Sequence, residues 1–304
     1  MKLQSITRRE ILSVGAALGL ARVGPAAAQT SLPRRSIPGT GELLPVIGLG
    51  SSKVVAEIAS NGPAPVAAVL RRLVAAGGSV VDTWPRNAEN DAAFGSVIAA
   101  PDLRDALFVT TKIDRTGRDA GIAQFESTLE NYRREQIDLA QVFSLTDIES
   151  HWPSLRAFKD DGRARYIGVT VADAGLYAAL NDFLRRETPD FVQINYSITE
   201  REAEERFLPM LADRGIAVII NRPFMNGAYF SRLENEPLPA WAADFDCISW
   251  AQFSLKYILA NTNLTCVLTE TSNPDHLAEN TQAALGAMPD AATRQRMREF
   301  IDAV

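Results

Sequence analysis

The sequence contains few cysteines and few histidines. Among its 304 residues there are two of each, Cys247 with Cys266 and His151 with His276. Cys247 lies at the start of a predicted helix and Cys266 lies within a predicted strand. We therefore expect two buried free thiols, with a single disulfide as the alternative. We expect no metal cofactor.

The sequence also lacks long basic runs and long apolar runs. Its net charge is −6, so nucleic acid is not an expected partner. No apolar run of the mature chain reaches the length of a membrane span. Because 46% of the residues are hydrophobic, a chain of this length suits one large domain with a sizeable core. We expect a monomer that binds a small molecule.

The first 28 residues have the pattern of an export signal. Arg8 and Arg9 precede a run of small and apolar residues at 13–21, and the alanines at 26–28 offer a cleavage site before Gln29. These features predict a secretory signal peptide, and the arginine pair is typical of the twin-arginine variant. Residues 29–304 would then form the mature domain, exported by the twin-arginine machinery to the periplasm, with no membrane contact after cleavage. The alternative is an amphipathic helix.

Short apolar runs alternate with helical patterns along the mature chain. The predicted strands are residues 46–50, 79–82, 107–112, 138–143, 164–169, 191–194, 216–220 and 264–268. Continuous apolar runs of this kind are typical of strands buried on both faces. Eight strands, each followed by a helix, predict an α/β fold, the (β/α)8 TIM barrel, with a doubly wound open sheet as the alternative. No Gly-x-Gly-x-x-Gly follows any strand, so a Rossmann dinucleotide site is not predicted.

Three further features surround the predicted barrel. An N-terminal hairpin is expected at residues 36–45, around a glycine-rich turn. Residues 221–246 form an irregular loop that is longer than usual, which suggests a functional role. The predicted helices are residues 65–76, 91–99, 119–134, 152–159, 174–185, 200–213, 248–259, 274–284 and an extra C-terminal helix at 290–303.

An aspartate and a lysine end neighbouring strands of this predicted barrel. Asp82 is the last residue of the second strand and Lys112 is the last residue of the third. Catalytic side chains of a parallel barrel collect at the carboxyl ends of its strands. We therefore expect Asp82 and Lys112 to meet in a functional site.

Motifs along nearly all of the mature chain resemble those of the aldo/keto reductases. They are Gly48-Leu49-Gly50, Asp82-Thr83, Thr111-Lys112, residues 137–142, residues 162–170, Gln193-Ile194-Asn195-Tyr196, Asn221-Arg222-Pro223-Phe224 and residues 271–280. Each motif is weak alone, but eight in order at strand ends resemble this family closely. The resemblance implies a barrel that transfers hydride between a nicotinamide nucleotide and a carbonyl or alcohol.

The chemistry of that family uses four side chains, and this sequence keeps two of them. In the family a tyrosine protonates the carbonyl oxygen, a lysine held by an aspartate makes the tyrosine more acidic, and a histidine orients the carbonyl. The resemblance assigns the lysine to Lys112 and the aspartate to Asp82. It places Asn87 where the tyrosine falls and Phe143 where the histidine falls.

These two replacements predict a slowed or redirected site. The Asn87 amide can donate a hydrogen bond but cannot release a proton, and Phe143 can do neither. Losing a general acid typically costs a factor of about 10²–10⁴ in rate. Lys112 and Asn87 could still polarise a carbonyl, and Arg86 beside them would serve as an oxyanion clamp.

The positions that hold the nucleotide in the family are partly changed. They correspond here to Gly50, Ser51, Ser52, Thr170, Gln193, Asn221, Arg222, Glu270, Thr271, Ser272, His276, Glu279 and Asn280, the last five at the adenosine end. Glu270 stands where the family has glycine, or a lysine that contacts the 2′-phosphate of NADP. A carboxylate there would repel the phosphate by about 1 kcal/mol or more. We expect NAD(P)(H) as the cofactor, without a preference for NADP.

Three functions remain open from the sequence. The first is an exported oxidoreductase of this family with a divergent site, and the second is a barrel that binds a small molecule or a protein without redox chemistry. The third is a carbohydrate-modifying enzyme that uses Asp82, Glu89 or Asp91 in the same pocket. The matches at the adenosine end support the first, whereas a periplasm without an NADPH pool weighs against it.

Overall fold

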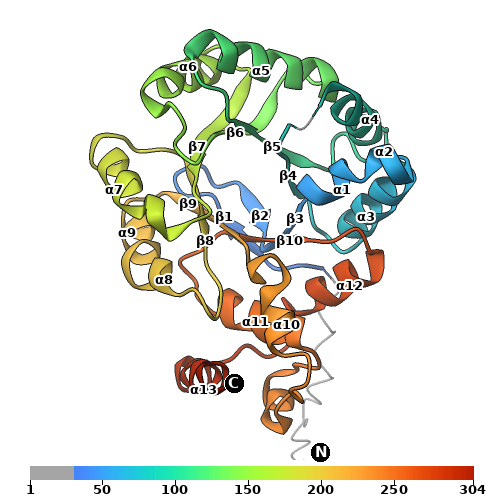
Figure 1. Ribbon diagram of the computed structural model, residues 1–304, viewed down its shortest axis with the longest axis vertical. Helices are drawn as coiled ribbons and strands as arrows, with labels where there is room; N and C mark the ends of the chain where they lie inside the picture. Colours follow the sequence, from blue (N-terminus) through green and yellow to red (C-terminus); the bar gives the residue numbers. More distant parts are fainter. Residues whose placement is uncertain (1–30, 86) are drawn as a thin grey trace, which may run out of the picture.

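Eight parallel strands close into a barrel in the computed structural model, which describes residues 31–85 and 87–304 (Figure 1). The hydrogen-bonded order around the barrel is β10-β3-β4-β5-β6-β7-β8-β9. The strands are β3 (Ile47–Gly50), β4 (Val80–Asp82), β5 (Phe108–Ile113), β6 (Ile137–Phe143), β7 (Ala164–Thr170), β8 (Phe191–Asn195), β9 (Ala217–Asn221) and β10 (Cys266–Glu270). The predicted (β/α)8 fold is confirmed, and the open-sheet alternative is wrong.

Helices cover the outside of the barrel between consecutive strands (Figure 1). The longer ones are α3 (Ala64–Ala75), α4 (Ala88–Ile98), α5 (Arg118–Tyr132), α6 (Ile148–Asp160), α7 (Tyr177–Arg186), α11 (Trp250–Leu259), α12 (Pro274–Gln282) and α13 (Ala291–Ala303). The shorter ones are α1 (Ser52–Ala56), α2 (Ile58–Asn61), α8 (Glu202–Arg206), α9 (Leu208–Asp213) and α10 (Ala228–Arg232).

Three stretches differ from the sequence-based expectation. α1 and α2 follow β3 directly, where no helix is predicted, and they bury Val54, Val55 and Ile58. The helix predicted at 200–213 is divided into α8 and α9, because Pro209 lacks the N–H that would continue one ladder. The loop predicted at 221–246 contains α10 and two short 3₁₀ turns.

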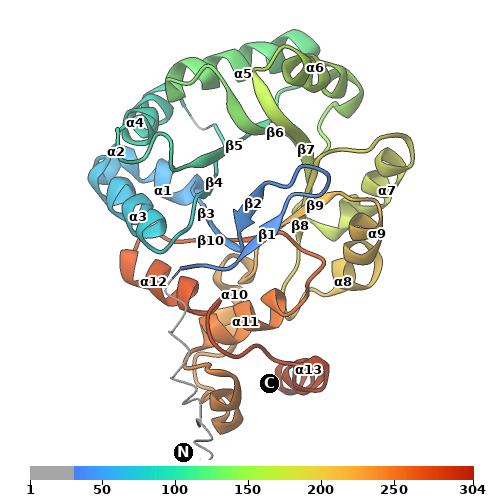
Figure 2. The same ribbon diagram turned by 180° about the vertical axis from the view of Figure 1, so that it is seen from behind.

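The predicted hairpin is present and covers the amino-terminal end of the barrel (Figure 2). β1 (Arg34–Ser36) pairs antiparallel with β2 (Leu43–Pro45). Ile37 and Leu44 are each 2% exposed and belong to the apolar cluster that fills this end of the barrel. Because this end is plugged, a ligand has access from the opposite end, where the strands terminate.

The extra helix α13 lies beside the barrel in both ribbon views (Figures 1 and 2). Its Arg294 forms an ion pair of 2.6 Å with Glu204 on α8. Glu204 also accepts hydrogen bonds from the hydroxyls of Tyr196 and Tyr257. Burial opposes ionisation, but the Tyr257 hydrogen bond and the Arg294 charge together hold the pKa of Glu204 below its ordinary value. This network anchors α13 without taking part in the barrel.

Both cysteines are free and buried, as predicted. Burial raises the pKa of the Cys247 thiol to about 11, so it stays protonated and is a poor nucleophile. Within the described ranges, no helix is both long enough and apolar enough to cross a membrane. The predicted signal peptide, residues 1–28, lies outside the described residues.

Candidate active site

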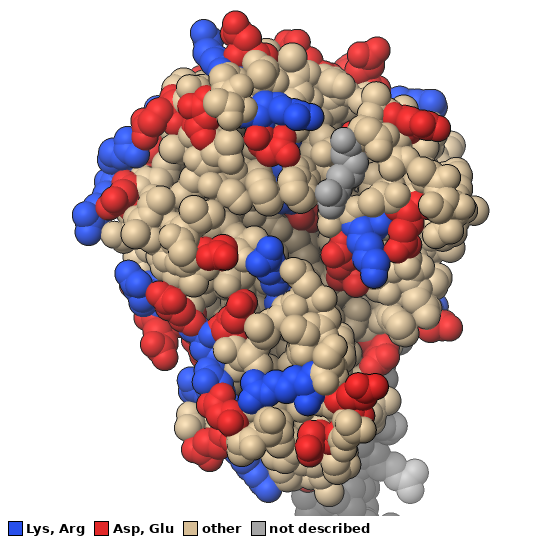
Figure 3. All heavy atoms as spheres, in the orientation of Figure 1, with Lys and Arg blue, Asp and Glu red and all other residues tan. Residues whose placement is uncertain are grey.

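A cavity of about 520 Å³ opens at the carboxyl ends of the strands. Figure 3 shows this face of the molecule, which is hollowed near its centre. The lining residues come from the ends of the strands and the loops that follow them. They include Gly50, Ser51, Ser52, Lys53, Asp82, Trp84, Lys112, Phe143, Thr170, Gln193, Asn221, Arg222, Phe224, Phe230 and Glu270.

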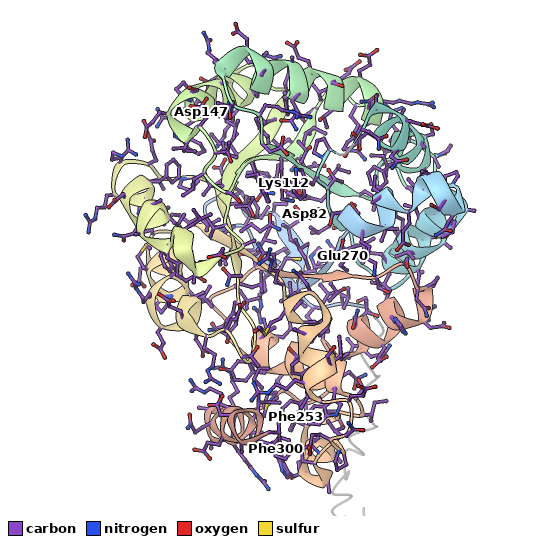
Figure 4. All side chains as sticks on the ribbon, viewed as in Figure 1. Asp82, Lys112, Asp147, Phe253, Glu270 and Phe300 are labelled. Carbon is purple, nitrogen blue, oxygen red and sulfur yellow. The ribbon has the colours of Figure 1, made fainter. Side chains whose placement is uncertain are left out.

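Asp82 and Lys112 meet in this cavity, close to the centre of the barrel (Figure 4). They are 8% and 5% exposed, and Lys112 Nζ lies 2.5 Å from Asp82 Oδ2. Lys112 also donates to the Thr83 carbonyl at 3.0 Å, and Thr110 Oγ1 donates to Asp82 Oδ1 at 2.5 Å. The structure therefore brings together the two residues that the strand ends suggested, as a buried and hydrogen-bonded ion pair.

Phe143 lines the same cavity and stacks on Trp84. The two ring centroids are 4.5 Å apart, with 23° between the ring planes. Trp84 follows β4, Phe143 ends β6, and Lys112 lies on the strand between them. Sequence reasoning assigned Phe143 to the site but did not foresee this contact.

Asn87 has a structural role at the start of α4. Its side-chain oxygen accepts a hydrogen bond from the backbone N–H of Asn90 at 2.9 Å, and the residue is exposed. The helix therefore begins at Ala88, and the start predicted at residue 91 is wrong. An asparagine before Ala88-Glu89 is a typical N-cap pattern and could have indicated this start from the sequence. Arg86, the proposed oxyanion clamp, lies outside the described residues.

A buried phenol near Asp82 does not replace the missing tyrosine. Tyr132 on α5 is 1% exposed and has Thr83, Asp91 and Asp82 among its electrostatic neighbours. Burial raises the pKa of this phenol, the Thr83 side chain lowers it by less, and the Asp91 and Asp82 carboxylates add smaller increases. Tyr132 is consequently a weaker acid than an exposed tyrosine, and a poor proton donor.

Several candidate cofactor residues converge on one side of the cavity. Thr170 and Gln193 are 1% and 2% exposed, and both line it. The side-chain oxygens of Gln193 and Asn221 are buried and have no hydrogen-bond partner among the described residues. Asn221 Nδ2 donates to the Val171 carbonyl at 3.0 Å, and Arg222 donates to the Ala172 carbonyl at 2.6 Å. This wall therefore has two side-chain oxygens, of Gln193 and Asn221, that could accept hydrogen bonds from a ligand.

The candidate adenosine-end residues surround a second cavity of about 400 Å³. Thr271, His276, Glu279 and Asn280 line it, and Ser272 is partly exposed in the adjoining turn before α12. The two cavities share Phe224, Phe230 and Glu270 in their linings. An elongated ligand could therefore extend from Lys112 to α12.

Glu270 lies where the two cavities meet (Figure 4). Its Oε1 accepts hydrogen bonds from Ser52 Oγ at 2.7 Å and from the Lys53 backbone N–H at 2.5 Å. These contacts join the end of β10 to the start of α1 and hold the carboxylate in place. Sequence reasoning identified the charge but not these partners, which are more than 200 residues away in the chain.

The fold is a (β/α)8 barrel with a cavity at the carboxyl ends of its strands. Residues 46–295 match the model of the aldo/keto reductase family, so the chain belongs to that family. In the part of the chain that the structure describes, no group of three or more His, Cys, Asp or Glu side chains could hold a metal.

Two relatives illustrate the range of similarity in sequence. An NADH-specific methylglyoxal reductase of Escherichia coli is 25% identical over 176 residues, which cover 49% of this chain and 52% of the relative. An L-galactose dehydrogenase of Arabidopsis thaliana is 23% identical over 287 residues, which cover 84% of this chain and 88% of the relative. The chain thus spans about half the length of the first relative and most of the second.

Solved structures support the fold. An aldo-keto reductase of Bacillus halodurans in its holo form superimposes with a TM-score of 0.71 at 18% identity, covering 88% of this chain and 96% of that one. An aldo-keto reductase of Klebsiella pneumoniae in complex with NADPH gives 0.71 at 17% identity, covering 91% and 96%. At such identities the likeness extends to the barrel and not to the choice of substrate.

Proposed function

We propose that this protein is a nicotinamide-dependent oxidoreductase of carbonyls or alcohols whose site transfers hydride slowly. The observation that carries the proposal is the buried Asp82–Lys112 pair at 2.5 Å inside the cavity, beside Phe143 and without a tyrosine at position 87. Lys112 holds a positive charge where a carbonyl oxygen would gain negative charge, which favours reduction. We expect the step to be slow because no tyrosine or histidine is among the described residues that line the cavity, and loss of a general acid costs a factor of about 10²–10⁴.

The cavity wall fits the nicotinamide end of such a nucleotide. A carboxamide has two N–H donors, and the buried oxygens of Gln193 and Asn221 are acceptors without a partner among the described residues. When bound, the nucleotide supplies the hydride. Gln193 and Asn221 would orient the nicotinamide ring, and Lys112 would hold the oxygen of the reacting carbonyl.

The adenosine end favours NAD over NADP. The hydrogen bonds from Ser52 and Lys53 keep the Glu270 carboxylate at the entrance to the second cavity. A 2′-phosphate at this position would meet a negative charge, whereas the free hydroxyl of NAD would not. The name of the Escherichia coli relative, an NADH-specific reductase, is in line with this preference.

We expect Glu270→Lys to shift the ratio of NADH to NADPH affinity toward NADPH by about 30-fold. The change replaces a negative charge with a positive one, and each unit of charge changes the interaction energy with a nearby phosphate by about 1 kcal/mol in water. Dissociation constants of both nucleotides from titration calorimetry give the ratio, which is insensitive to effects on the shared part of the ligand. Glu270→Gln, which removes the charge alone, should produce about half of the shift in free energy. Tighter binding of NADPH than of NADH to the wild type would contradict the role of Glu270.

The second candidate function is a barrel that binds a ligand without redox chemistry. The stacking of Phe143 on Trp84 favours it, because an aromatic ring occupies position 143, where the family places a histidine. Two measurements separate the candidates: mass spectrometry of the denatured protein for a retained nucleotide, and NADH oxidation with 4-nitrobenzaldehyde. Nucleotide with measurable turnover supports the oxidoreductase, and their joint absence supports the binding barrel.

The carbohydrate-modifying alternative gains no support from the structure. Asp82 is paired with Lys112, Glu89 is exposed on α4, and Asp91 is buried. Glycoside hydrolysis requires two carboxyl groups on either side of one bond. These three carboxylates do not form such a pair at the cavity wall.

We further propose that the protein is exported by the twin-arginine route to the periplasm and acts there as a monomer of residues 29–304. The sequence pattern of residues 1–28 supports export. Export of a folded chain would allow the nucleotide to be loaded in the cytoplasm, and a tightly held nucleotide would not depend on a periplasmic pool.

We expect Arg8→Lys combined with Arg9→Lys to retain the uncleaved protein in the cytoplasm, because the arginine pair is what the export receptor reads. Cell fractionation with detection of both precursor and mature forms measures the effect. Arg185→Lys with Arg186→Lys, an adjacent exposed pair on α7, is the control and should leave export unchanged. Normal export of the first variant would remove the twin-arginine assignment.

A further inference from the structure

Two aromatic rings form the cavity wall beside Lys112. Trp84 and Phe143 stack at 4.5 Å between centroids, both line the cavity, and both are partly exposed. They flank the strand that carries Lys112, since Trp84 follows β4 and Phe143 ends β6. A ligand whose oxygen reaches Lys112 would therefore lie against ring surface.

Other contacts fix the position of each ring. Trp84 Nε1 donates to Asp114 Oδ2 at 2.8 Å, and Gln124 on α5 donates to the other oxygen of Asp114 at 2.9 Å. After Phe143 the backbone passes through left-handed conformations at Ser144 and Leu145, and the Ser144 N–H donates to the Thr170 carbonyl at 2.8 Å. Left-handed backbone at residues other than glycine persists only where the surroundings enforce it. The Trp84 indole and the backbone that follows Phe143 are thus each held by hydrogen bonds.

The described residues of this wall, Lys112, Trp84 and Phe143, offer a ligand few hydrogen bonds. A lysine ammonium has three N–H donors, and Lys112 gives one to Asp82 and one to the Thr83 carbonyl. Among the described residues Lys112 has no further acceptor, so one donor is left for a ligand oxygen. The indole N–H of Trp84 is bonded to Asp114, and Phe143 has no polar atom. A hydroxyl group placed against these two rings would lose its hydration without replacement.

We propose that Trp84 and Phe143 determine specificity, and that they select a compound with a flat apolar ring next to a single carbonyl or alcohol oxygen. This inference rests on the proposed function, whose substrate class it narrows to aryl aldehydes, aryl ketones and the corresponding alcohols. The oxygen accepts a hydrogen bond from Lys112 Nζ, and the ring lies against the exposed parts of Trp84 and Phe143. Phe143 stands where the family has the histidine that orients the carbonyl.

The test measures binding without turnover. Benzamide and cyclohexanecarboxamide share one carbonyl and similar size, but only benzamide has a flat ring. With the protein saturated with NAD⁺, the wild type should bind benzamide about 2- to 10-fold more tightly than cyclohexanecarboxamide. This is the range expected for an aromatic contact in addition to the burial of apolar area. Phe143→Leu and Trp84→Leu should each bring this ratio close to one. Phe300→Leu, at an aromatic residue of α13 far from Lys112 in Figure 4, is the matched control and should preserve it.

Acetophenone and ethylbenzene test the oxygen contact on the unmodified protein. Acetophenone should bind about 10-fold more tightly than ethylbenzene, because a hydrogen bond from a charged donor is stronger than one between neutral groups. Equal affinities in either ligand pair with the wild type, or ratios unchanged in both leucine variants, would overturn the inference. Since no hydride transfer is needed, a protein that binds these probes as expected but never turns over contradicts only the proposed function. Turnover of aldehydes without a preference for rings contradicts only the specificity.

Discussion

The triple variant Trp84→Ala, Asn87→Tyr, Phe143→His should reduce 4-nitrobenzaldehyde about 10²–10⁴-fold faster than the wild type, the range associated with gaining a general acid. Asp82 and Lys112 are already joined at 2.5 Å, so a phenol brought to Lys112 would find its ionic partner in place. The imidazole at position 143 would supply the orienting group at the end of β6. Trp84→Ala is included because the indole stacks directly on the side chain at position 143. Oxidation of NADH at saturating aldehyde is the measurement.

The double variant that retains Trp84 is the decisive control. It should recover much less activity than the triple variant, and the three changes should not be additive, because they act on one carbonyl oxygen. Asn87→Tyr also removes the N-cap of α4, so we expect a loss of stability of about 1 kcal/mol, to be checked by thermal unfolding. An inactive triple variant that still folds and binds NADH would show that the cavity has been rebuilt for a purpose other than hydride transfer.

The barrel could be predicted from the sequence because its signals are local. Continuous apolar runs such as residues 138–143 are typical of strands buried on both faces, and Gly77-Gly78 marks the end of the helix before β4. Asp82 and Lys112 could be paired for the same reason, since parallel strands bring their carboxyl ends to one rim. Once the strand ends were known, the position of this pair followed from topology.

The rest of the site depends on contacts that the sequence does not encode locally. The resemblance places Asn87 where the tyrosine falls, but the helix that begins at Ala88 makes that asparagine an N-cap. Glu270 is positioned by Ser52 and Lys53, which precede it by more than 200 residues. Trp84 and Phe143 meet across the strand between them. In each case closure of the barrel, and not the neighbouring sequence, decides where the side chain lies.

A buried ion pair whose family partners are missing raises the question of why it persists. Asp82 accepts hydrogen bonds from Thr110 and from the amides of Gln141 and Gln193, in addition to its contact with Lys112. Such a pair can be retained for the stability of the cavity rim as well as for chemistry. Removing one charge alone is costly, because it leaves the other charge buried without its partner.

Lys112→Met should therefore lower the free energy of unfolding by about 3 kcal/mol, near the lower end of the range for breaking a buried pair, since Asp82 keeps its three other donors. Adding Asp82→Asn removes the remaining charge and should restore stability to within about 1 kcal/mol of the wild type. Urea unfolding followed by circular dichroism measures each member of this double-mutant cycle. Arg71→Met, which breaks the exposed pair with Asp102, is the surface control and should leave the unfolding midpoint unchanged. If Lys112→Met unfolds at the same urea concentration as the wild type, the pair does not stabilise the fold, and its retention inside the cavity must then be explained by the ligand that Lys112 binds.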